Sequence, residues 1–387
     1  MNSKNFKTKT FIQPRFNPQI PGMWPMALDI GYSSVKMFSP NMVASFPSYA
    51  KRVEYGAADN TIGEPDKTCI SYRDENGHEY YVGENAQKSI RYTDSDNSTA
   101  ALYIRDRYYS PEFKVIARVG MALGLGKNQY GSPNGNTIYL QTGLPPEYMT
   151  IDTDDLKNAL CGHHVFKLKI GSGEWKDFDF TIDIENIGVM PQPMGTLVSV
   201  GTKNNGDPLP QWEEYTKAGT LVIDPGFGTL DTFEIFNNRV ETSKTWNNLG
   251  MHRILQEAAK IIQTEYKQVI PVPAMQKVLE DGFFKTKLNR ETRRCESIDI
   301  NPILERAVKE VCNEVIETLD GFYNALQNIN YLIITGGTSE AWFDIFKENY
   351  GGMGINIIKG NVNDDIPMIF ANVRGYYMTA ITTLKGR

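Results

Sequence analysis

One pattern occurs twice in this chain, and the two copies constrain the fold more than any other feature of the sequence. Residues 221–235 read LVIDPGFGTLDTFEI, in which a short apolar run leads into an acid and then into a turn with two glycines. Residues 26–38 read MALDIGYSSVKMF and align with the first stretch without gaps. Because this is a single duplication over a long period, it predicts two similar half-molecules and not a solenoid of short repeats.

The aligned residues of the two copies share a chemistry. Asp29 corresponds to Asp224, and Gly31 corresponds to Gly226. Glycines at a strand end let backbone N–H groups approach an anion closely, and the carboxylate beside them suits a divalent cation bound to phosphate. A hairpin turn with no ligand is the alternative interpretation of each copy. The remaining matched pairs are Tyr32 with Phe227, Ser34 with Thr229, Val35 with Leu230 and Phe38 with Phe233.

One aligned position differs in charge between the copies. Lys36 stands in the first copy where Asp231 stands in the second. A lysine can neutralise phosphate as a point charge, whereas acids suit the vicinity of a metal and an attacking water. We therefore expect the two halves to face one polyphosphate and to play different roles. The first half would neutralise phosphate, and the second would lie nearer the metal and the attacking water.

A third glycine turn follows the apolar run YLIITGG, residues 331–337. The pair Gly336-Gly337 ends a predicted strand, and Thr338 and Ser339 stand where the next helix would begin. Glycines at such a strand-to-helix turn let the backbone lie flat against a planar or anionic ligand. Downstream of two phosphate-type hairpins, this turn indicates a further contact to the same ligand.

Size, charge and cysteine content exclude several classes of protein. A chain of 387 residues with 41% hydrophobic content can bury a large core and is expected to form two domains. The net charge of −6 argues against direct binding to nucleic acid. No apolar run reaches the length of a membrane span. Four cysteines without C-x-x-C spacing indicate a reducing cytoplasm and no zinc site; they are Cys69, Cys161, Cys295 and Cys312.

Periodicity and turn residues place the other elements. Four prolines within residues 1–25 predict a flexible extension, with an arm that docks its aromatics on a neighbouring subunit as the alternative. Alternation predicts one half-exposed strand over 178–190, and a continuous apolar face predicts a helix over 301–319. Residues 201–219 are expected to cross between domains. Strands and helices together predict an α/β fold with a mixed sheet in each half and ligand in the crevice between halves.

The three glycine motifs, in this order, resemble the phosphate-1, phosphate-2 and adenosine motifs of the superfamily that contains actin, heat-shock chaperones and sugar kinases. Within it the chain looks most like the ParM group of bacterial actin-like, plasmid-segregating ATPases. The narrower resemblance also uses YYVGENA at 80–86, TGLPPEY at 142–148 and ANVRGYY at 371–377. It covers roughly residues 26–387, and the stretches 1–25 and 201–219 look like additions.

The resemblance implies an actin-like ATPase fold, an α/β fold with two ribonuclease-H-like domains whose mixed sheets flank a nucleotide cleft. Domain I would comprise residues 26–200 and 360–387, and domain II residues 201–359, with residues 1–25 as the flexible extension. The implied cofactors are ATP, or GTP, and Mg²⁺.

Roles for single residues also follow from the resemblance. Asp29 and Asp224 would hold Mg²⁺ through waters, and Lys36 would contact the β-phosphate. Gln192 matches the position at which relatives orient the attacking water, so Gln192 and Asp224 are the implied catalytic residues. A neutral amide can only position water by hydrogen bonds, and a plain first-turn helix residue between two prolines is the alternative interpretation. The implied nucleotide contacts are Gly31, Tyr32, Ser33, Ser34, Lys36, Gly226, Phe227, Gly228 and Thr229 at the phosphates and Gly336, Gly337 and Thr338 at adenine or ribose.

The function implied by the resemblance is that of a nucleotide-dependent, filament-forming ATPase in the cytoplasm. The chain would assemble head to tail with itself, and hydrolysis would weaken the polymer. In the ParM-like role the filament moves plasmid DNA through a DNA-bound adaptor protein, which agrees with the acidic composition. The alternatives are a monomeric phosphotransferase of the sugar- or acid-kinase type and a cytoskeletal scaffold. A chaperone is disfavoured because no substrate-binding domain follows the adenosine motif.

Overall fold

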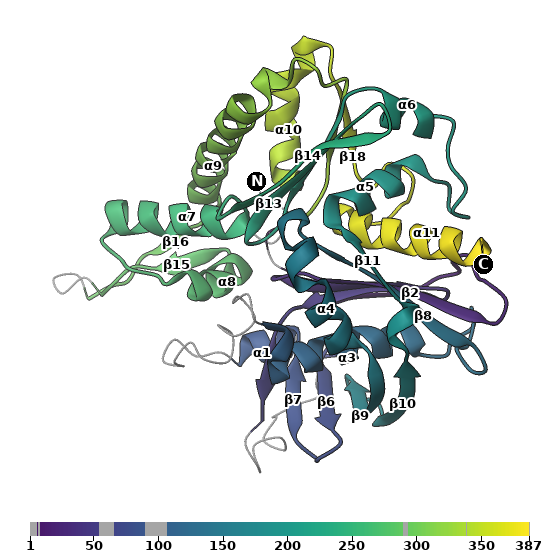
Figure 1. Ribbon diagram of the computed structural model, residues 1–387. Helices are drawn as coiled ribbons and strands as arrows, with labels where there is room; N and C mark the ends of the chain where they lie inside the picture. The colour runs from purple at the N-terminus through teal and green to yellow at the C-terminus, as the bar shows by residue number, and fades with distance from the viewer. Residues whose placement is uncertain are drawn as a thin grey trace. The chain divides into compact units, whose positions relative to one another are not determined.

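The computed structural model describes residues 6, 8–53, 66–89, 107–288, 293–337 and 339–386. The chain forms two compact units (Figure 1). Unit 1 comprises Met1–Lys7 and Glu213–Val362, and unit 2 comprises Thr8–Trp212 and Asn363–Arg387.

The sequence placed the domain boundaries after residues 200 and 359, whereas the units divide after Trp212 and Val362. The first boundary differs because the polar stretch after residue 200 folds back onto unit 2. The Lys385 ammonium group donates a hydrogen bond to the Asn205 carbonyl at 2.9 Å, and Leu209 N donates to Gly201 O at 2.8 Å. Such long-range contacts leave no local signal in the sequence.

A six-stranded mixed sheet forms the centre of unit 2, with the strand order β1-β4-β3-β2-β8-β11. In this sheet β2 pairs antiparallel with β3 and parallel with β8, and β8 pairs parallel with β11. Its strands are β1 (Phe11–Pro14), β2 (Met23–Ile30), β3 (Ser34–Ser39), β4 (Met42–Pro47), β8 (Thr137–Leu144) and β11 (Ile187–Pro191).

Helices cover both faces of this sheet, so its central strands are apolar on both sides. Leu28 of β2 lies in one hydrophobic cluster with residues of α3 (Pro111–Leu125), whereas its neighbour Ala27 lies in another with residues of α11 (Ala371–Lys385). The Ser110 side chain caps α3 by accepting a hydrogen bond from Phe113 N, and a proline follows at the first helical position. Helix α5 (Gln192–Gly201) packs against α11.

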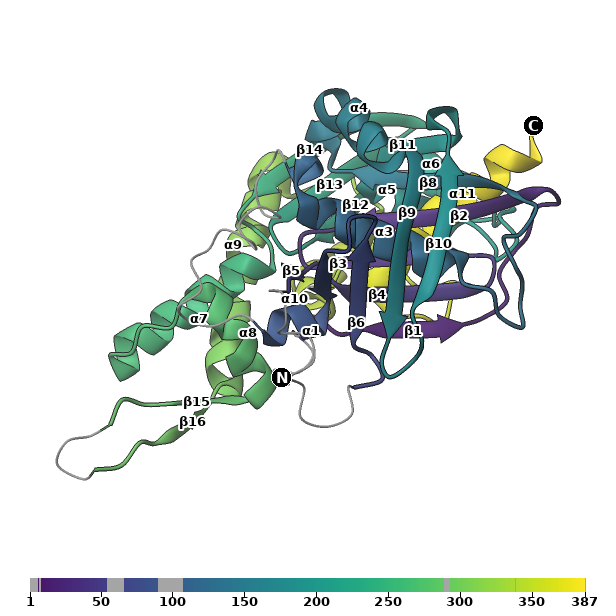
Figure 2. The same ribbon diagram turned by 90° about the horizontal axis from the view of Figure 1, so that it is seen from below.

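Unit 2 also contains a five-stranded antiparallel sheet, ordered β10-β9-β6-β7-β5, in which β10, β9 and β6 run side by side (Figure 2). The single strand predicted over 178–190 is wrong. It is two strands of different sheets, because a 3₁₀ turn at Ile184–Asn186 separates β10 from β11. The further elements are β5 (Ala50–Arg52), β6 (Ile70–Asp74), β7 (Glu79–Val82), β9 (Gly162–Ile170), β10 (Lys176–Ile182), α1 (Glu84–Lys88) and α4 (Met149–Leu160).

Unit 1 is built on a five-stranded mixed sheet with the order β14-β13-β12-β17-β18. Its longest helix, α9 (Asn301–Phe322), buries the apolar face that the sequence predicted, from Ile303 to Leu319. The other elements are β12 (Thr220–Pro225), β13 (Thr229–Phe236), β14 (Arg239–Asn247), β17 (Tyr331–Ile334), β18 (Asn356–Lys359), β15 (Phe283–Lys285), β16 (Ser297–Asp299), α6 (Trp212–Lys217), α7 (Met251–Tyr266), α8 (Val272–Asp281) and α10 (Ser339–Tyr350).

The central sheets of the two units have the same topology. In unit 2 the order β4-β3-β2-β8-β11 has two antiparallel pairs followed by two parallel pairs. In unit 1 the order β14-β13-β12-β17-β18 repeats that sequence of orientations. The repeated sequence pattern therefore marks two structurally equivalent halves, as the alignment predicted.

The N-terminal stretch, predicted to be flexible through residue 25, is folded onto unit 2 from Thr8 onward. Strand β1 pairs antiparallel with β4, and β2 begins at Met23. The aromatic residues of this stretch have partners that the sequence could not identify: Phe11 lies 5.3 Å from the Phe370 ring, and the Trp24 indole donates to Gly124 O at 2.9 Å. None of the helices in the described residues combines the length and the hydropathy that a bilayer span needs.

Candidate active site

The first Asp–Gly turn joins β2 to β3. Gly31 N donates a hydrogen bond to Ser34 O at 3.1 Å, which closes the turn, and Asp29 then lies directly opposite Lys36 in the antiparallel ladder. The Lys36 ammonium group lies 3.1 Å from the Asp29 carboxylate, which is 3% exposed. The hairpin thus holds a buried acid and a cation together at the end of a central strand.

Gln192 reaches the same acid from another element. It is the first residue of α5, after Pro191, and its amide nitrogen donates to the other carboxylate oxygen of Asp29 at 3.4 Å. The structure therefore brings Asp29, Lys36 and Gln192 together. The geometry agrees with both interpretations of Gln192. It is the first residue of a helix, as the structural interpretation requires, and its side chain points to Asp29, the implied metal ligand, as the catalytic interpretation requires.

Two residues that the sequence did not single out fix the back of this turn. The Ser48 hydroxyl donates to Gly31 O at 2.7 Å, and Ser48 N donates to Ser33 O at 2.9 Å. The buried Arg107 guanidinium donates to Ile30 O at 2.7 Å and lies 4.5 Å from the centre of the Tyr32 ring. Arg107 is 77 positions from Ile30 in the chain, so no local pattern could have shown it.

The second turn, between β12 and β13, repeats the geometry of the first. Gly226 N donates to Thr229 O at 2.9 Å, and Asp224 lies opposite Asp231 in the ladder. Here the start of α7 supports the turn from behind, because Met251 N donates to Gly226 O at 3.0 Å and His252 N donates to Phe227 O at 2.8 Å. Asn248 N likewise donates to Gly228 O at 2.9 Å.

The acid that replaces the lysine in this second turn is held by hydroxyl groups. Asp231 is 2% exposed, and its two carboxylate oxygens accept hydrogen bonds from Thr245 at 2.6 Å and Thr229 at 3.1 Å. Beside the turn, burial lowers the pKa of His252, whose ring lies 5.9 Å from that of Phe227. The second turn therefore has two carboxyl groups, those of Asp224 and Asp231, where the first has a carboxyl group and a lysine.

The third glycine motif lies against the second turn. Gly336 follows β17 with a φ of +85°, and a Cβ there would lie 2.5 Å from the Asp224 carboxylate and 2.7 Å from Pro225 O. Only glycine permits this backbone conformation and this approach at once. Gly337 follows at the surface, and Thr338 lies outside the described residues.

The donor set of these turns suits a magnesium-bound phosphate. Asp29 and Asp224, 3% and 5% exposed, provide the hard oxygen ligands that Mg²⁺ prefers, and Lys36 provides a compact positive charge. Among the described residues no three His, Cys, Asp or Glu side chains group as a protein-only metal site. Mg²⁺ commonly uses one or two carboxylates together with phosphates and waters. These residues therefore fit the implied cofactor.

Comparisons with known proteins agree with this geometry. Residues 27–195 match the family described as actin-like proteins, N-terminal domain. No curated protein sequence matches the chain. Among solved structures, a 15-stranded ParM filament from Clostridium botulinum is 23% identical with a TM-score of 0.68, covering 93% of this chain and 99% of that one.

Two other solved structures are informative. A non-polymerisable quadruple mutant of the ParM called pCBH is 22% identical with a TM-score of 0.67, covering 92% of this chain and 98% of that one. An archaeal actin homologue in complex with ADP is 16% identical with a TM-score of 0.59, covering 92% and 99%. At these identities the matches establish the fold. The chain therefore has an actin-like fold, similar to that of ParM and other actin homologues, and its residues 27–195 match the family of actin-like N-terminal domains.

Proposed function

We propose that this chain is a nucleotide-dependent ATPase that assembles into filaments. The observation that carries the proposal is the pair of equivalent Asp–Gly turns, each closed by the same backbone hydrogen bond at the end of a central strand. Both turns contribute to the binding of ATP, or GTP, with Mg²⁺. The matched ParM filament and the ADP complex of the archaeal homologue support assembly and nucleotide binding, respectively.

Each residue of the turns has a distinct task in this proposal. Asp29 and Asp224 hold the metal, which when bound neutralises the charge of the phosphates. Lys36 contacts phosphate as a point charge. The Gln192 amide orients the attacking water by hydrogen bonds, since it cannot accept a proton as a carboxylate would. Gly336 lets the adenosine turn lie against Asp224 and Pro225.

Hydrolysis is coupled to assembly because the γ-phosphate contacts favour the polymerising state. Replacing Gln192 by Ala is expected to slow phosphate release about tenfold and to lengthen filament lifetime, because the water loses its orientation while nucleotide binding is kept. Time-resolved phosphate release and scattering decay measure both effects. Unchanged turnover would leave Gln192 with its structural role alone.

The biological role follows from the ParM-like fold and is part of the proposal. A filament of this chain moves plasmid DNA through a DNA-bound adaptor protein, because the net charge of −6 makes direct contact with DNA unfavourable. The four cysteines are free, which agrees with a cytoplasmic location.

The test is light scattering and negative-stain imaging with Mg·ATP, Mg·GTP or Mg²⁺ alone, while phosphate release is followed in the same sample. The proposal expects prompt, nucleotide-triggered scattering that decays as phosphate appears. Glu310→Gln, on the exposed side of α9, is the control and should behave as the wild type. Phosphate transfer to a small acceptor by a chain that stays monomeric at all concentrations would favour the phosphotransferase alternative instead.

A further inference from the structure

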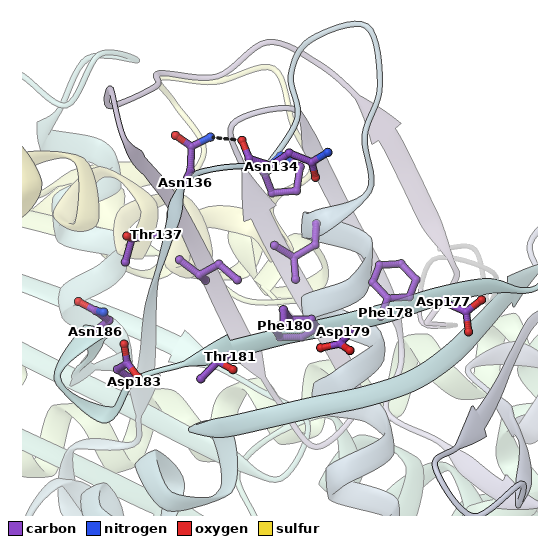
Figure 3. Close-up of a pocket in the computed structure, with 13 residues that line it drawn as sticks. Asn134, Asn136, Thr137, Asp177, Phe178, Asp179, Phe180, Thr181, Asp183 and Asn186 are labelled. Carbon is purple, nitrogen blue, oxygen red and sulfur yellow. Dashed lines mark hydrogen bonds between the residues drawn. The ribbon is translucent and has the colours of Figure 1, made fainter.

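A trough of about 520 Å³ runs along one edge of β10 in unit 2 (Figure 3). It touches the consecutive residues Asp177–Thr181. Because consecutive residues of a strand point to opposite faces, a cavity in contact with all of them must follow the backbone edge. The opposite wall is formed by the loop before β8 and the first residues of that strand, including Asn134, Asn136 and Ile138.

Strand β10 is an edge strand whose phenylalanine side chains pack against aromatic rings of β9. Within the described part of the chain it is hydrogen-bonded to β9 alone, so its outer edge presents backbone N–H and C=O groups. Phe178 and Phe180 line the trough, and their rings stack on Phe166 at 5.3 Å and His164 at 5.0 Å. An edge held in this way is suited to accept one more strand.

The charge along this edge indicates a basic strand. Asp177 and Asp179 stand two residues apart on the same face of β10, with side chains 75% and 73% exposed. On the inner side they already face side chains of β9, with the Lys167 ammonium group 3.0 Å from Asp177 and the His163 ring 2.7 Å from Asp179. Asp183 continues the acidic wall. The free side of this acidic row lies open for a second set of cations.

The chain contains such a strand in unit 1. Strands β15 and β16 pair only with each other in the described residues, and they project from the rest of the unit (Figures 1 and 2). Lys285 is the last residue of β15, and Lys287 lies in the segment that continues it; both are exposed. If that segment stays extended, the two lysines have the same spacing as the aspartates on β10. Neither lysine has an ion-pair partner among the described residues. A two-stranded hairpin of this kind gains most from a third strand.

We propose that β15 of one copy, together with the segment that continues it to Lys287, adds to the outer edge of β10 in a second copy, with Lys285 and Lys287 opposite Asp177 and Asp179. The exposed side chain of Leu288 then lies near the apolar base of the trough. This contact joins two different surfaces, so it propagates into a polymer and does not stop at a dimer unless the rotation closes a ring. The inference rests on the proposed function and names one contact through which the filament forms.

Charge reversal tests the contact through two double variants. Asp177→Lys with Asp179→Lys gives a basic edge, and Lys285→Asp with Lys287→Asp gives an acidic hairpin. Each variant alone is expected to raise the protein concentration needed for Mg·ATP-triggered scattering by about tenfold, since like charges then face each other across the paired strands. Glu305→Lys with Glu310→Lys, on exposed positions of α9, is the matched control and should keep the wild-type threshold.

An equimolar mixture of the two reversed variants gives the decisive result. In the mixture a basic hairpin can meet an acidic edge, and an acidic hairpin can meet a basic edge, so alternating copies should restore assembly to within about threefold of the wild type. Binding of a fluorescent nucleotide and the melting temperature should be unchanged in both variants. Impaired variants that the mixture does not rescue would overturn the pairing.

The outcome also separates this inference from the proposed function. If the wild type assembles with nucleotide and both reversed variants do so at the same threshold, the contact is wrong and the filament function stands. If the wild type binds no nucleotide and remains monomeric, the function and the contact both fail.

Discussion

The two Asp–Gly turns have the same backbone but different supports. In each, the first glycine N–H donates to the carbonyl three residues on, and the acid lies across the ladder from the residue seven positions on. In unit 2 the turn is fixed from behind by the hydroxyl and the N–H of Ser48 and by the Arg107 side chain. In unit 1 it is fixed by backbone N–H groups at the start of α7. The two turns therefore share their backbone geometry and differ in the residues that support them from behind.

The difference in charge between the turns has a physical consequence. Lys36 gives the first turn a cation paired with Asp29, whereas the second turn carries Asp231 bound by two hydroxyl groups. A cation favours phosphate, whereas the second turn has the buried carboxyl group of Asp231 opposite Asp224. We infer that the first turn mainly neutralises phosphate and the second mainly organises the metal side.

The largest expected effect comes from the acids that both turns share. Asp29→Asn and Asp224→Asn should each reduce phosphate release about a hundredfold, because an amide does not replace the charge of a metal-bound carboxylate. Phosphate release at saturating Mg·ATP measures the loss, and Mg²⁺ titration separates weaker metal binding from slower chemistry. Wild-type turnover in one of the two variants would contradict the equivalence of the turns, since the two acids would then have unequal roles.

The second prediction concerns a substitution that disturbs only the unit 1 turn, at the start of α7. A Cβ at Gly250 would lie 2.6 Å from Gly226 O and 2.7 Å from Phe227 O, so Gly250→Ala must displace the turn or the start of α7. We expect a loss of about 2 kcal/mol in the free energy of unfolding. Urea denaturation measures it.

A glycine with open space provides the control for that variant. Gly321 of α9 has no atom within 4 Å of the position of a Cβ. Gly321→Ala should therefore leave stability unchanged or raise it by up to about 1 kcal/mol through helix propensity. Equal losses in both variants would show that the close approach at Gly250 does not matter.

The third prediction uses the one aligned position that differs between the turns. Lys36→Met should weaken Mg·ATP binding about tenfold, because a hydrogen-bonded charge on phosphate is lost. Asp231→Asn should leave nucleotide affinity close to that of the wild type and lower the melting temperature, since its two hydroxyl donors are no longer equally satisfied. Nucleotide titration and thermal melting of both variants distinguish the roles. The assignment is contradicted if Asp231→Asn weakens the nucleotide as much as Lys36→Met.

The sequence predicted the parts of this comparison that are local. The ungapped alignment matched Asp29 with Asp224 and Lys36 with Asp231. The structure confirms that the two hairpins are equivalent, because in both the acid lies opposite the residue seven positions on. The apolar face of α9 follows from a period of 3.6 in the same way. The proposed ligand contacts of these residues stay predictions.

What the sequence missed depends on partners far along the chain. Arg107 behind the first turn and the pairing of β1 with β4 have no local signature. The stretch 178–190 keeps an alternating pattern while it passes from one sheet to another, and periodicity cannot detect that change of partner. The sequence predicted that the turn at Gly336 contacts the same ligand as the two hairpins, but the close approach of Gly336 to Asp224 came only from the structure.

The last and smallest expected effect concerns the sheet that unit 2 has in addition to the shared core. His164 of β9 is 4% exposed, and burial, together with the charges of Arg118 and Lys114, lowers its pKa to about 4. The unfolded chain binds a proton below a pH of about 6.5 and the folded chain does not. The stabilising effect of the neutral ring is thus present above that pH and is lost as the pH falls toward 4.

Between pH 7.5 and pH 5.5, the titration of His164 should lower the unfolding free energy of the wild type by about 1 kcal/mol. His164→Gln removes the titrating ring and should lose that component of the pH dependence, whereas His163→Gln, at an exposed position of the same strand, should keep it. Denaturant midpoints of the three proteins at both pH values give the comparison. Because unit 1 has no counterpart of this sheet among its described residues, a pH effect that follows His164 would locate the acid sensitivity in unit 2. An undiminished loss in His164→Gln would instead direct attention to other groups, including His252 beside the second turn, whose pKa burial also lowers.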